Sequence, residues 1–242
     1  MKLTTSLALA CILGGSEILH GQVGDKKPYD GQSDVGLTHD DAKVMLGTYV
    51  GAFGAQKITI CLDRIIGKTV TGYSIVAGNE RAFSGSWERS WSDFDVTVKE
   101  PGDHAADGVF QFKYVAAEKS LLGEWKPNDK KIGIRKFNLP ARKFTYNPKV
   151  GKYPQSSTRS LTEKDVENLK NEELRIMRNE IYARHGYSFK LADMREHFDK
   201  LDWYMPMAID ITTQLTKVET KNAALIRRYE KYSADFYDSF GR

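Results

Sequence analysis

The sequence contains very little cysteine, since Cys11 and Cys61 are the only two in 242 residues. If Cys11 is removed or acylated during export, Cys61 is the only thiol left and no intrachain disulfide can form. Cys61 lies within an apolar run, which favours a small buried side chain over a catalytic nucleophile.

Blocks of one charge are also missing. The 36 Lys and Arg residues exceed the 32 Asp and Glu residues by a formal net charge of +4, and they are spread along the chain. Nucleic-acid-binding arms have concentrated basic runs, so we expect no nucleic-acid partner. Hydrophobic residues make up 40% and charged residues 28%, which is typical of a globular chain with one large domain or two small ones.

The sequence patterns of common enzymes are absent as well. "FSGSWE" lacks the second glycine of a G-x-S-x-G nucleophile turn, and no histidine has a partner at the spacing of H-E-x-x-H. The histidines are His20, His39, His104, His185 and His197. Acidic residues are concentrated between Asp93 and Asp107. The last three lie in "EPGDHAADG", a stretch more typical of a solvated hairpin loop than of a calcium site. We expect no metal and no cofactor.

The N-terminus has the pattern of a secretory signal peptide over residues 1–21. One Lys precedes a short apolar run from Leu7 to Leu13, and small residues follow it. The run is far below the roughly 20 residues that span a bilayer. "LALAC" resembles a lipobox, which makes Cys11 a lipidation candidate, although Ala8 stands where Leu is preferred. We expect an extracytoplasmic protein (periplasmic, secreted or an outer-envelope lipoprotein) whose membrane contact is a lipid anchor at most.

After a polar, Gly-rich linker at residues 22–43, residues 44–146 consist of short β-type runs separated by turn residues. Alternation and hairpin spacing predict an antiparallel meander of about eight strands, forming a small barrel or a sandwich. The predicted strands are residues 46–53, 57–65, 68–76, 80–87, 92–100, 107–115, 119–126 and 131–139.

Glycine followed by an aromatic residue recurs in these strands, at Gly47, Gly85 and Gly123, with Gly72 nearby. Glycine inside a strand often marks a bulge or bend, so these positions favour a curved sheet. The tryptophans have two interpretations. Core packing is favoured because inward aromatic side chains close a small barrel, while the alternative is a ligand cavity lined by Trp87, Trp91 and Trp125.

A Pro- and Ser-rich linker at residues 147–160 precedes a region of helical periodicity, residues 161–235. Capping patterns predict helix starts at Thr162, Asn171 and Thr216, and Gly186 is a predicted helix end. A stripe formed by Leu174, Met177, Ile181 and His185 predicts one buried face, and a further helix is expected over residues 191–201. The predicted fold is therefore α+β, with a β domain followed by a small all-α domain.

The helical region resembles a known bacterial module. "LRIMRNEIYARHGYSF", "FDKLDWYMP" and "LTKVETKNAALIRRYE" are similar to the YARHG domain, which is named for the motif at Tyr182–Gly186. The resemblance covers about residues 158–232 and includes the pairs Arg178-Asn179 and Trp203-Tyr204. It implies a helical fold and an extracytoplasmic, envelope-associated setting, but no catalytic residues. The β half loosely resembles the small barrels that accompany such modules in secreted bacterial proteins.

The motif itself has two interpretations. In the structural one, Glu180 and Arg184 form an ion pair, the His185 ring covers helix-end carbonyls, and Tyr187 and Phe189 turn back to the core after Gly186. In the functional one, Arg178, Arg184 and His185 form a cationic-aromatic pocket with Tyr182, and this pocket binds an anionic envelope ligand such as a peptide carboxylate, a muropeptide or a phosphate. The ligand-binding candidates are Arg178, Tyr182, Arg184, His185, Trp203 and Tyr204.

Two function classes follow from these patterns. The first is a non-enzymatic exported protein that binds a cell-envelope component, such as peptidoglycan, or a small ligand through the barrel, the YARHG module or both. The alternative is an envelope peptide or glycan hydrolase that uses Glu180 with His185. The sequence leaves the ligand and the oligomeric state open.

Overall fold

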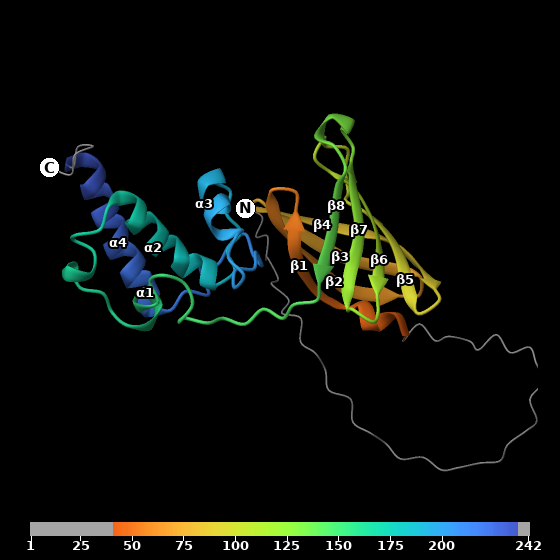
Figure 1. The fold of residues 1–242 in the computed structure, drawn as a ribbon, viewed down its shortest axis with the longest axis horizontal. Coiled ribbons are helices and arrows are strands. Elements are labelled where there is room, and N and C mark those ends of the chain that lie inside the picture. The colour runs from red at the N-terminus through yellow and green to blue at the C-terminus, as the bar shows by residue number, and fades with distance from the viewer. Residues whose placement is uncertain (1–40, 237–242) are drawn as a thin grey trace, which may run out of the picture.

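The computed structural model describes residues 41–236, which form an N-terminal β-barrel and a C-terminal helical region (Figure 1). The predicted signal peptide (1–21), the lipidation candidate Cys11 and most of the predicted linker 22–43 lie outside these residues. None of the helices within residues 41–236 combines the length and the hydrophobicity that a membrane-spanning helix requires.

The barrel is a single antiparallel sheet in which every strand pairs with its neighbours in the sequence. The strands are β1 Gly47–Phe53, β2 Gln56–Ile66, β3 Thr69–Val76, β4 Asn79–Ser90, β5 Asp93–Lys99, β6 Gly108–Val115, β7 Ser120–Pro127 and β8 Arg135–Pro140. A bridge between Tyr49 and Ala141, and a 2.8 Å hydrogen bond from the Arg142 N–H to the Thr48 carbonyl, bring the two edges together. The predicted eight-stranded meander is confirmed as a nearly closed barrel.

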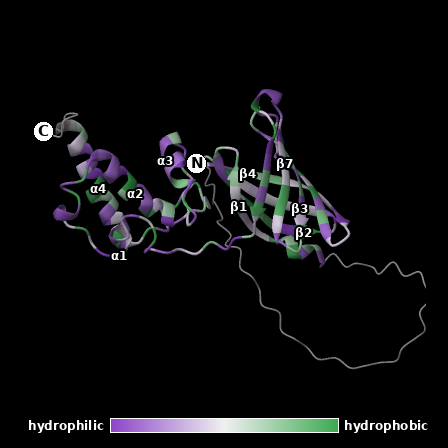
Figure 2. Cartoon of the chain, viewed as in Figure 1, coloured by the Kyte–Doolittle hydropathy of each residue, from purple (hydrophilic) through white to green (hydrophobic). Residues whose placement is uncertain are grey.

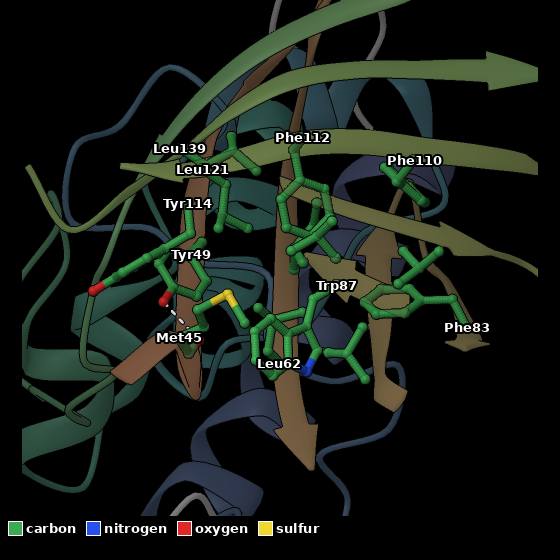
Figure 3. Close-up of a cluster of buried hydrophobic side chains, with 14 of the residues drawn as sticks. Met45, Tyr49, Leu62, Phe83, Trp87, Phe110, Phe112, Tyr114, Leu121 and Leu139 are labelled. Carbon is green, nitrogen blue, oxygen red and sulfur yellow. Dashed lines mark hydrogen bonds between the residues drawn. The ribbon is translucent and has the colours of Figure 1, made fainter. Parts of the chain in front are cut away.

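Alternating residues of the strands fill the barrel. Phe94, Val96 and Val98 of β5 are buried, and so are Phe110 and the next alternate residues of β6, Phe112 and Tyr114. Figure 3 shows side chains of this kind from several strands pointing toward one another. Burying one such side chain contributes roughly 1.5–3 kcal/mol, so this interior is the main source of the barrel's stability.

A short 3₁₀ helix, η1 (Asp41–Met45), lies at one end of the barrel. Ala42 and Met45 are fully buried against the core. The Tyr49 hydroxyl donates a 2.7 Å hydrogen bond to the Met45 carbonyl (Figure 3). Residues 41–45 therefore belong to the barrel's core.

Three strand glycines allow neighbouring backbone to approach closely. A Cβ at Gly85 or Gly123 would collide with the carbonyl oxygen of Thr97 or Gln111. A Cβ at Gly72 would collide with Cys61, beside a shift of register between Leu62 and Arg64 in the β2–β3 pair. The shift at Gly72 confirms one predicted irregularity, and all three glycines permit the curvature of a small barrel.

The helical region contains α1 Gln155–Thr158, the 3₁₀ helix η3 Glu163–Asp165, α2 Asn171–Arg184, α3 Ala192–Phe198 and α4 Lys217–Phe236. The longest two, α2 and α4, pack together through apolar residues that include Leu174, Met177, Ile181 and Ile226. The predicted helical stripe on α2 is buried, as expected. Helix α1 lies inside the stretch predicted as a linker, where Tyr153 and Ser156 are also buried.

Two of the three predicted helix starts have the expected capping boxes. Thr216 and Glu219 exchange hydrogen bonds of 3.0 and 3.1 Å at the start of α4, and Thr162 pairs similarly with Asp165 at η3. The prediction that Asn171 caps α2 is wrong. Asn171 is the first helical residue, and its amide donates a 2.8 Å hydrogen bond to the Glu230 carbonyl of α4 instead.

The two regions contact each other directly through Lys57 at the start of β2. Its ammonium donates to the carbonyls of Leu201 (2.7 Å) and Tyr204 (3.1 Å), and its backbone N–H donates to the Asp199 carboxylate. The Gly78 N–H and the Arg142 guanidinium add one hydrogen bond each to the helical region, to Ser188 and to the Asp202 carbonyl. Burial lowers the pKa of Lys57, and the nearby Arg142 guanidinium acts in the same direction.

Candidate functional site

The YARHG motif lies at the C-terminal end of α2, where the chain reverses. The Tyr187 N–H donates to the Tyr182 carbonyl (3.1 Å) and the Gly186 N–H to the Ala183 carbonyl (2.9 Å), which is the bonding pattern of a Schellman stop. Gly186 has φ +77°, a conformation that glycine adopts without strain. The rings of Tyr182 and Tyr187 meet edge to face, 6.3 Å apart, and Phe189 is buried beyond them. The predicted helix stop is confirmed.

Arg184 lies inside the helical region with its side chain fully buried. It donates to Glu180 (2.7 Å), as the i,i+4 spacing predicts, and also to the hydroxyls of Ser156 and Ser157 (2.9 Å each). Its Nε donates to the Val150 carbonyl at 2.8 Å. Burial lowers the pKa of Arg184, while the nearby carboxylates of Glu180 and Glu219 act in the opposite direction.

Glu180 connects α2 to the segment that enters the helical region. Its carboxylate accepts the backbone N–H groups of Lys152 (2.6 Å) and Tyr153 (2.8 Å) in addition to Arg184. These amides belong to a segment without helix or strand partners, so the carboxylate satisfies donors that would otherwise be buried and unpaired. The side chains of Glu180 and Arg184 therefore hold residues 150–157 against α2.

His185, which directly follows α2, belongs to a separate hydrogen-bonded group with Tyr146 and with Glu219 of α4. Its Nε2 lies 2.8 Å from the Glu219 carboxylate, and its ring stacks on Tyr146 with 4.4 Å between centroids. The Tyr146 hydroxyl donates to the other Glu219 oxygen at 3.0 Å. The prediction that this ring covers helix-end carbonyls is wrong, because the backbone N–H groups of Gly186 and Tyr187 already occupy those of Ala183 and Tyr182.

The charge of Glu219 is stabilised despite full burial of its side chain. Burial alone would raise the pKa of Glu219, but hydrogen bonds from His185, the Thr216 N–H and Ser157 lower it to about 2. The same carboxylate, together with burial, raises the pKa of Tyr146 to about 12. The Glu219 carboxylate is therefore a stable anion, surrounded by His185, Tyr146 and the Thr216 N–H.

The remaining candidates of the motif do not converge on these groups. Arg178 makes a bidentate ion pair with Glu230 of α4, at 2.6 and 3.0 Å, and lies 5.8 Å from the centre of the Tyr182 ring. Tyr204 is buried, and its hydroxyl donates to the Tyr187 carbonyl, while Trp203 packs partly buried beside it. The side chains predicted to form an anion pocket thus bind other parts of the domain.

Glu180 and His185, the residues of the hydrolase alternative, are also engaged in hydrogen bonds within the domain. Glu180 accepts three hydrogen bonds, and His185 bonds to Glu219 rather than to Glu180. Both residues are buried, with Glu180 at 1% and His185 at 6% exposure. The geometry gives this pair no access to a substrate.

Sequence patterns did not identify several partners of the motif. Tyr146, Ser156 and Ser157 lie in or next to the predicted linker, and Asn222 lies in a stretch that resembles the YARHG domain. The Asn222 amide donates to the carbonyls of Ser156 and Arg159 and accepts the Leu161 N–H, so it also fixes this stretch to α4. Only Glu219 had a local signal, its place in the Thr216 capping box.

The three tryptophans of the barrel differ in their surroundings. Trp87 and Trp125 are buried in the core, where their Nε1 atoms donate to the Gly67 carbonyl (3.0 Å) and to Glu100 (3.1 Å). Trp91 lies in the turn between β4 and β5 and is 95% exposed, so it does not line the interior. The cavity interpretation fails for Trp91 because β4 ends at Ser90, before this side chain can turn inward.

Glu100 is a buried carboxylate at the opposite end of the barrel from η1. Burial raises its pKa, although Trp125, Ser74 and the Gly108 N–H all donate to it. Neighbouring Asp107 pairs with Arg81 at 3.0 Å. No cluster of three or more His, Cys, Asp or Glu side chains that could hold a metal ion occurs within residues 41–236.

Hollows occur on the surface of residues 41–236, and two of them are large enough to bear on a binding site. One, of about 460 Å³, lies on the outer face of β4–β7 and is lined mainly by polar residues such as Glu88, Asp95 and Lys113. The other, of about 390 Å³, lies beside α4 and is called the α4 hollow below. Its lining residues are Glu163, Val166, Glu167, Leu169, Leu174, Arg228, Tyr229, Tyr232 and Ser233.

The α4 hollow combines an apolar floor with a charged rim. Val166 and Leu174 are buried at its base, and Tyr232 is 55% exposed at its edge. Arg228 of α4 reaches Glu163 of η3 at 3.1 Å across the rim and lies 5.5 Å from the centre of the Tyr229 ring. Its size falls within the usual range of small-ligand sites, about 300–1,000 Å³.

Comparison with known proteins gives one match. The model of the YARHG domain matches residues 151–231, while no curated protein and no solved structure matches the chain. The match begins upstream of α1, so it includes Lys152, Tyr153, Ser156 and Ser157, the partners of Glu180 and Arg184. Residues 151–231 of this chain are a YARHG domain.

Proposed function

We propose that this chain is a non-enzymatic, exported protein of the bacterial envelope that binds an envelope component in the α4 hollow. The observation that carries the proposal is the hollow itself, which has two tyrosines, an apolar floor and a rim of Glu163, Glu167 and Arg228. Tyrosine rings and aliphatic side chains pack on the apolar faces of sugars and peptides, and rim charges select the ligand's polar groups. Peptidoglycan fragments offer both kinds of surface.

The motif has a supporting part in this proposal. The walls of the hollow come from α2, α4 and the stretch from Glu163 to Leu169. Arg184 and Asn222 fix residues 150–161, immediately before that stretch, to α2 and α4. The motif residues would therefore hold the hollow's walls in position without touching the ligand.

The proposed location rests on two separate signals. The pattern of residues 1–21 predicts export, and the resemblance of the helical region to the YARHG domain implies an extracytoplasmic, envelope-associated setting. The hydrolase alternative receives no support, because Glu180 and His185 are buried and hydrogen-bonded within the domain.

Binding to purified cell-wall sacculi tests the proposal. Wild type should co-sediment with sacculi, and Tyr232→Ser should bind at least about fivefold more weakly, because it removes an aromatic contact of roughly 1 kcal/mol or more. Leu191→Ser is a matched control, since Leu191 is exposed to a similar degree (62%) but lies outside the hollow, next to α3. Equal retention of Tyr232→Ser and wild type would remove the hollow from the account. Release of soluble muropeptides during the incubation would contradict the non-enzymatic part.

A further inference from the structure

The hairpin between β7 and β8 ends in an exposed tip that is both basic and apolar. The tip, residues 130–134, reads KKIGI, and all five of its residues are exposed. Ile134 is 58% and Ile132 is 37% exposed, although isoleucine is among the residues most often buried. Neither Lys130 nor Lys131 makes an ion pair with any residue between 41 and 236. The tip therefore presents unpaired cations beside uncovered aliphatic side chains.

The tip has a defined conformation. Lys130–Ile132 form the 3₁₀ helix η2, which Asp129 caps by accepting the Lys131 N–H at 2.9 Å. The base of the hairpin is joined to the β5–β6 loop by hydrogen bonds from the Asn128 N–H to the Asp107 carbonyl (2.7 Å) and from the Asp129 N–H to the Ala105 carbonyl (3.2 Å). The exposed isoleucines are thus held on an ordered support.

The tip also projects beyond its surroundings. Figure 1 shows this hairpin rising past the other barrel turns, at the end away from η1. Figure 2 shows hydrophilic and hydrophobic residues side by side along it. A flat surface could therefore contact the tip without meeting the rest of the barrel first.

The charged side chains of the tip and of the residues directly after it are all basic. Residues 130–136 contain Lys130, Lys131, Arg135 and Lys136 and no acidic residue. Arg135 is directed to the barrel, where it lies over Phe53 and Trp125 and donates to Gln56. The other three are exposed lysines, while Asp129 is occupied as a cap and Asp103 is exposed on the neighbouring loop. The local field favours an anionic partner.

We propose that this tip docks on the surface of an anionic phospholipid bilayer, with Ile132 and Ile134 entering the interface and Lys130 and Lys131 meeting lipid phosphates. Aliphatic residues flanked by lysines are suited to the boundary between headgroups and acyl chains. Each lysine near an anionic leaflet strengthens binding, by about fivefold at roughly 1 kcal/mol per charge. A protein partner fits less well, because one hairpin turn cannot supply the roughly 800 Å² per partner of a stable interface.

This inference goes beyond the proposed function and shares no residue with the α4 hollow. The two proposals therefore fail separately. A tip of this kind gives weak and reversible attachment, comparable to that of one short acyl chain.

Vesicle co-sedimentation tests the inference. Every variant carries Cys11→Ser, so that no acyl chain contributes, and every variant has the same N-terminus. Wild type should bind vesicles of equal parts phosphatidylglycerol and phosphatidylcholine, and bind pure phosphatidylcholine much more weakly. The double variant Lys130→Gln/Lys131→Gln should reduce binding to the anionic vesicles by roughly thirtyfold, and Ile132→Ser/Ile134→Ser by roughly tenfold.

Trp91→Ser is the matched control, because Trp91 is the most exposed large apolar residue within residues 41–236 and lies in a turn at the other end of the barrel. It should leave binding unchanged. Absence of binding by wild type, equal binding to both kinds of vesicle, retention of binding by the tip variants, or loss of binding in Trp91→Ser would each overturn the inference.

A located probe adds a second readout. A polarity-sensitive dye on Ile134→Cys should shift to the blue with anionic vesicles, while the same dye on Trp91→Cys should not. Cys61 is buried and does not compete for the label in the folded protein. A shift at position 91 alone would assign membrane contact to the wrong end and contradict the inference.

Discussion

The barrel and the YARHG domain are stabilised in different ways. The barrel interior is mainly apolar, with aromatic side chains such as Phe53, Phe110 and Phe137 in mutual contact, and a buried carboxylate, Glu100, lies at one end. The YARHG domain instead buries charged and polar groups beside its apolar core. These are Ser156, Ser157, Asn179, Glu180, Arg184, His185, Ser188, Glu219 and Asn222.

The difference follows from how each region satisfies its backbone. Neighbouring strands pair with each other throughout the barrel, so its backbone groups need few side-chain partners and most of its interior is apolar. Residues 146–154 enter the helical domain with neither helix nor strand, and their backbone groups need partners. Glu180 accepts two of their N–H groups and Arg184 donates to one of their carbonyls. The buried polar network is therefore what attaches an irregular segment to two helices.

The largest expected effect comes from removing Arg184. Arg184→Met should destabilise the YARHG domain by about 3–5 kcal/mol, because the buried Glu180 carboxylate would lose the cation with which it pairs. Urea unfolding followed by circular dichroism at helical wavelengths would measure the change. Arg178→Met is the control, since its ion pair with Glu230 is partly exposed and its loss should cost less. Similar losses in the two variants would contradict a special role for the network.

An apolar truncation should act on the barrel instead. Phe110→Ala leaves a cavity among Phe53, Phe83, Trp125 and Phe137, at a cost toward the lower end of about 3–5 kcal/mol as neighbours relax. Tryptophan fluorescence during unfolding should report the loss through buried Trp87 and Trp125. If the helical signal fell with the same midpoint, the two regions would be one cooperative unit rather than two cores of different kinds.

The third effect depends on pH. The pKa of Glu219 is lowered from 4.5 to about 2, so its ionisation stabilises the fold above pH 4.5 and that contribution is lost as pH falls toward 2. The contribution amounts to about 3 kcal/mol. Urea midpoints from neutral pH to about pH 3 should fall more steeply for wild type than for Glu219→Gln. Parallel pH profiles would show that the His185–Glu219 group does not stabilise the domain.

The smallest effect is expected at the helix stop. Gly186→Ala should cost about 1–2 kcal/mol, because an alanine at φ +77° is strained. Its Cβ would also lie 2.8 Å from the Cβ of Met207. Thermal unfolding would measure the change, and Gly67→Ala is the control, since its φ of +55° is also positive but no atom lies within 4 Å of its Cβ. Equal losses would mean that backbone strain alone accounts for the effect.

Local patterns predicted most of the fold. Alternating residues and turn signals placed the strands to within a few residues, apart from β8, because an antiparallel meander depends on neighbours in sequence. The first residues of the predicted last strand form η2 instead, where Asp129 caps a 3₁₀ turn. The Glu180–Arg184 pair and the stop at Gly186 were also predictable, since both depend on spacing within one helix.

The tertiary partners of the motif could not be predicted. Tyr146, Ser156 and Ser157 precede His185 and Arg184 by 27 to 39 positions along the chain, in a stretch whose composition indicates a linker. Nothing in local spacing shows that Glu219 bonds to His185, 34 positions away. Trp91 shows the same limit, because its exposure depends on where β4 ends. The proposed binding site is therefore the α4 hollow rather than the motif, and the motif residues are proposed to hold the walls of the hollow in position.

The central claim is that the motif is an internal framework of the YARHG domain. Hydrogen exchange of residues 146–154, which enter that domain, tests it most directly. If the motif is an internal framework, Arg184→Met should strip protection from the amides of Lys152 and Tyr153, which bond to Glu180, while amides of β5 and β6 keep theirs. The account would be contradicted if Lys152 and Tyr153 stayed protected while binding to sacculi was lost, since Arg184 would then act on the ligand itself.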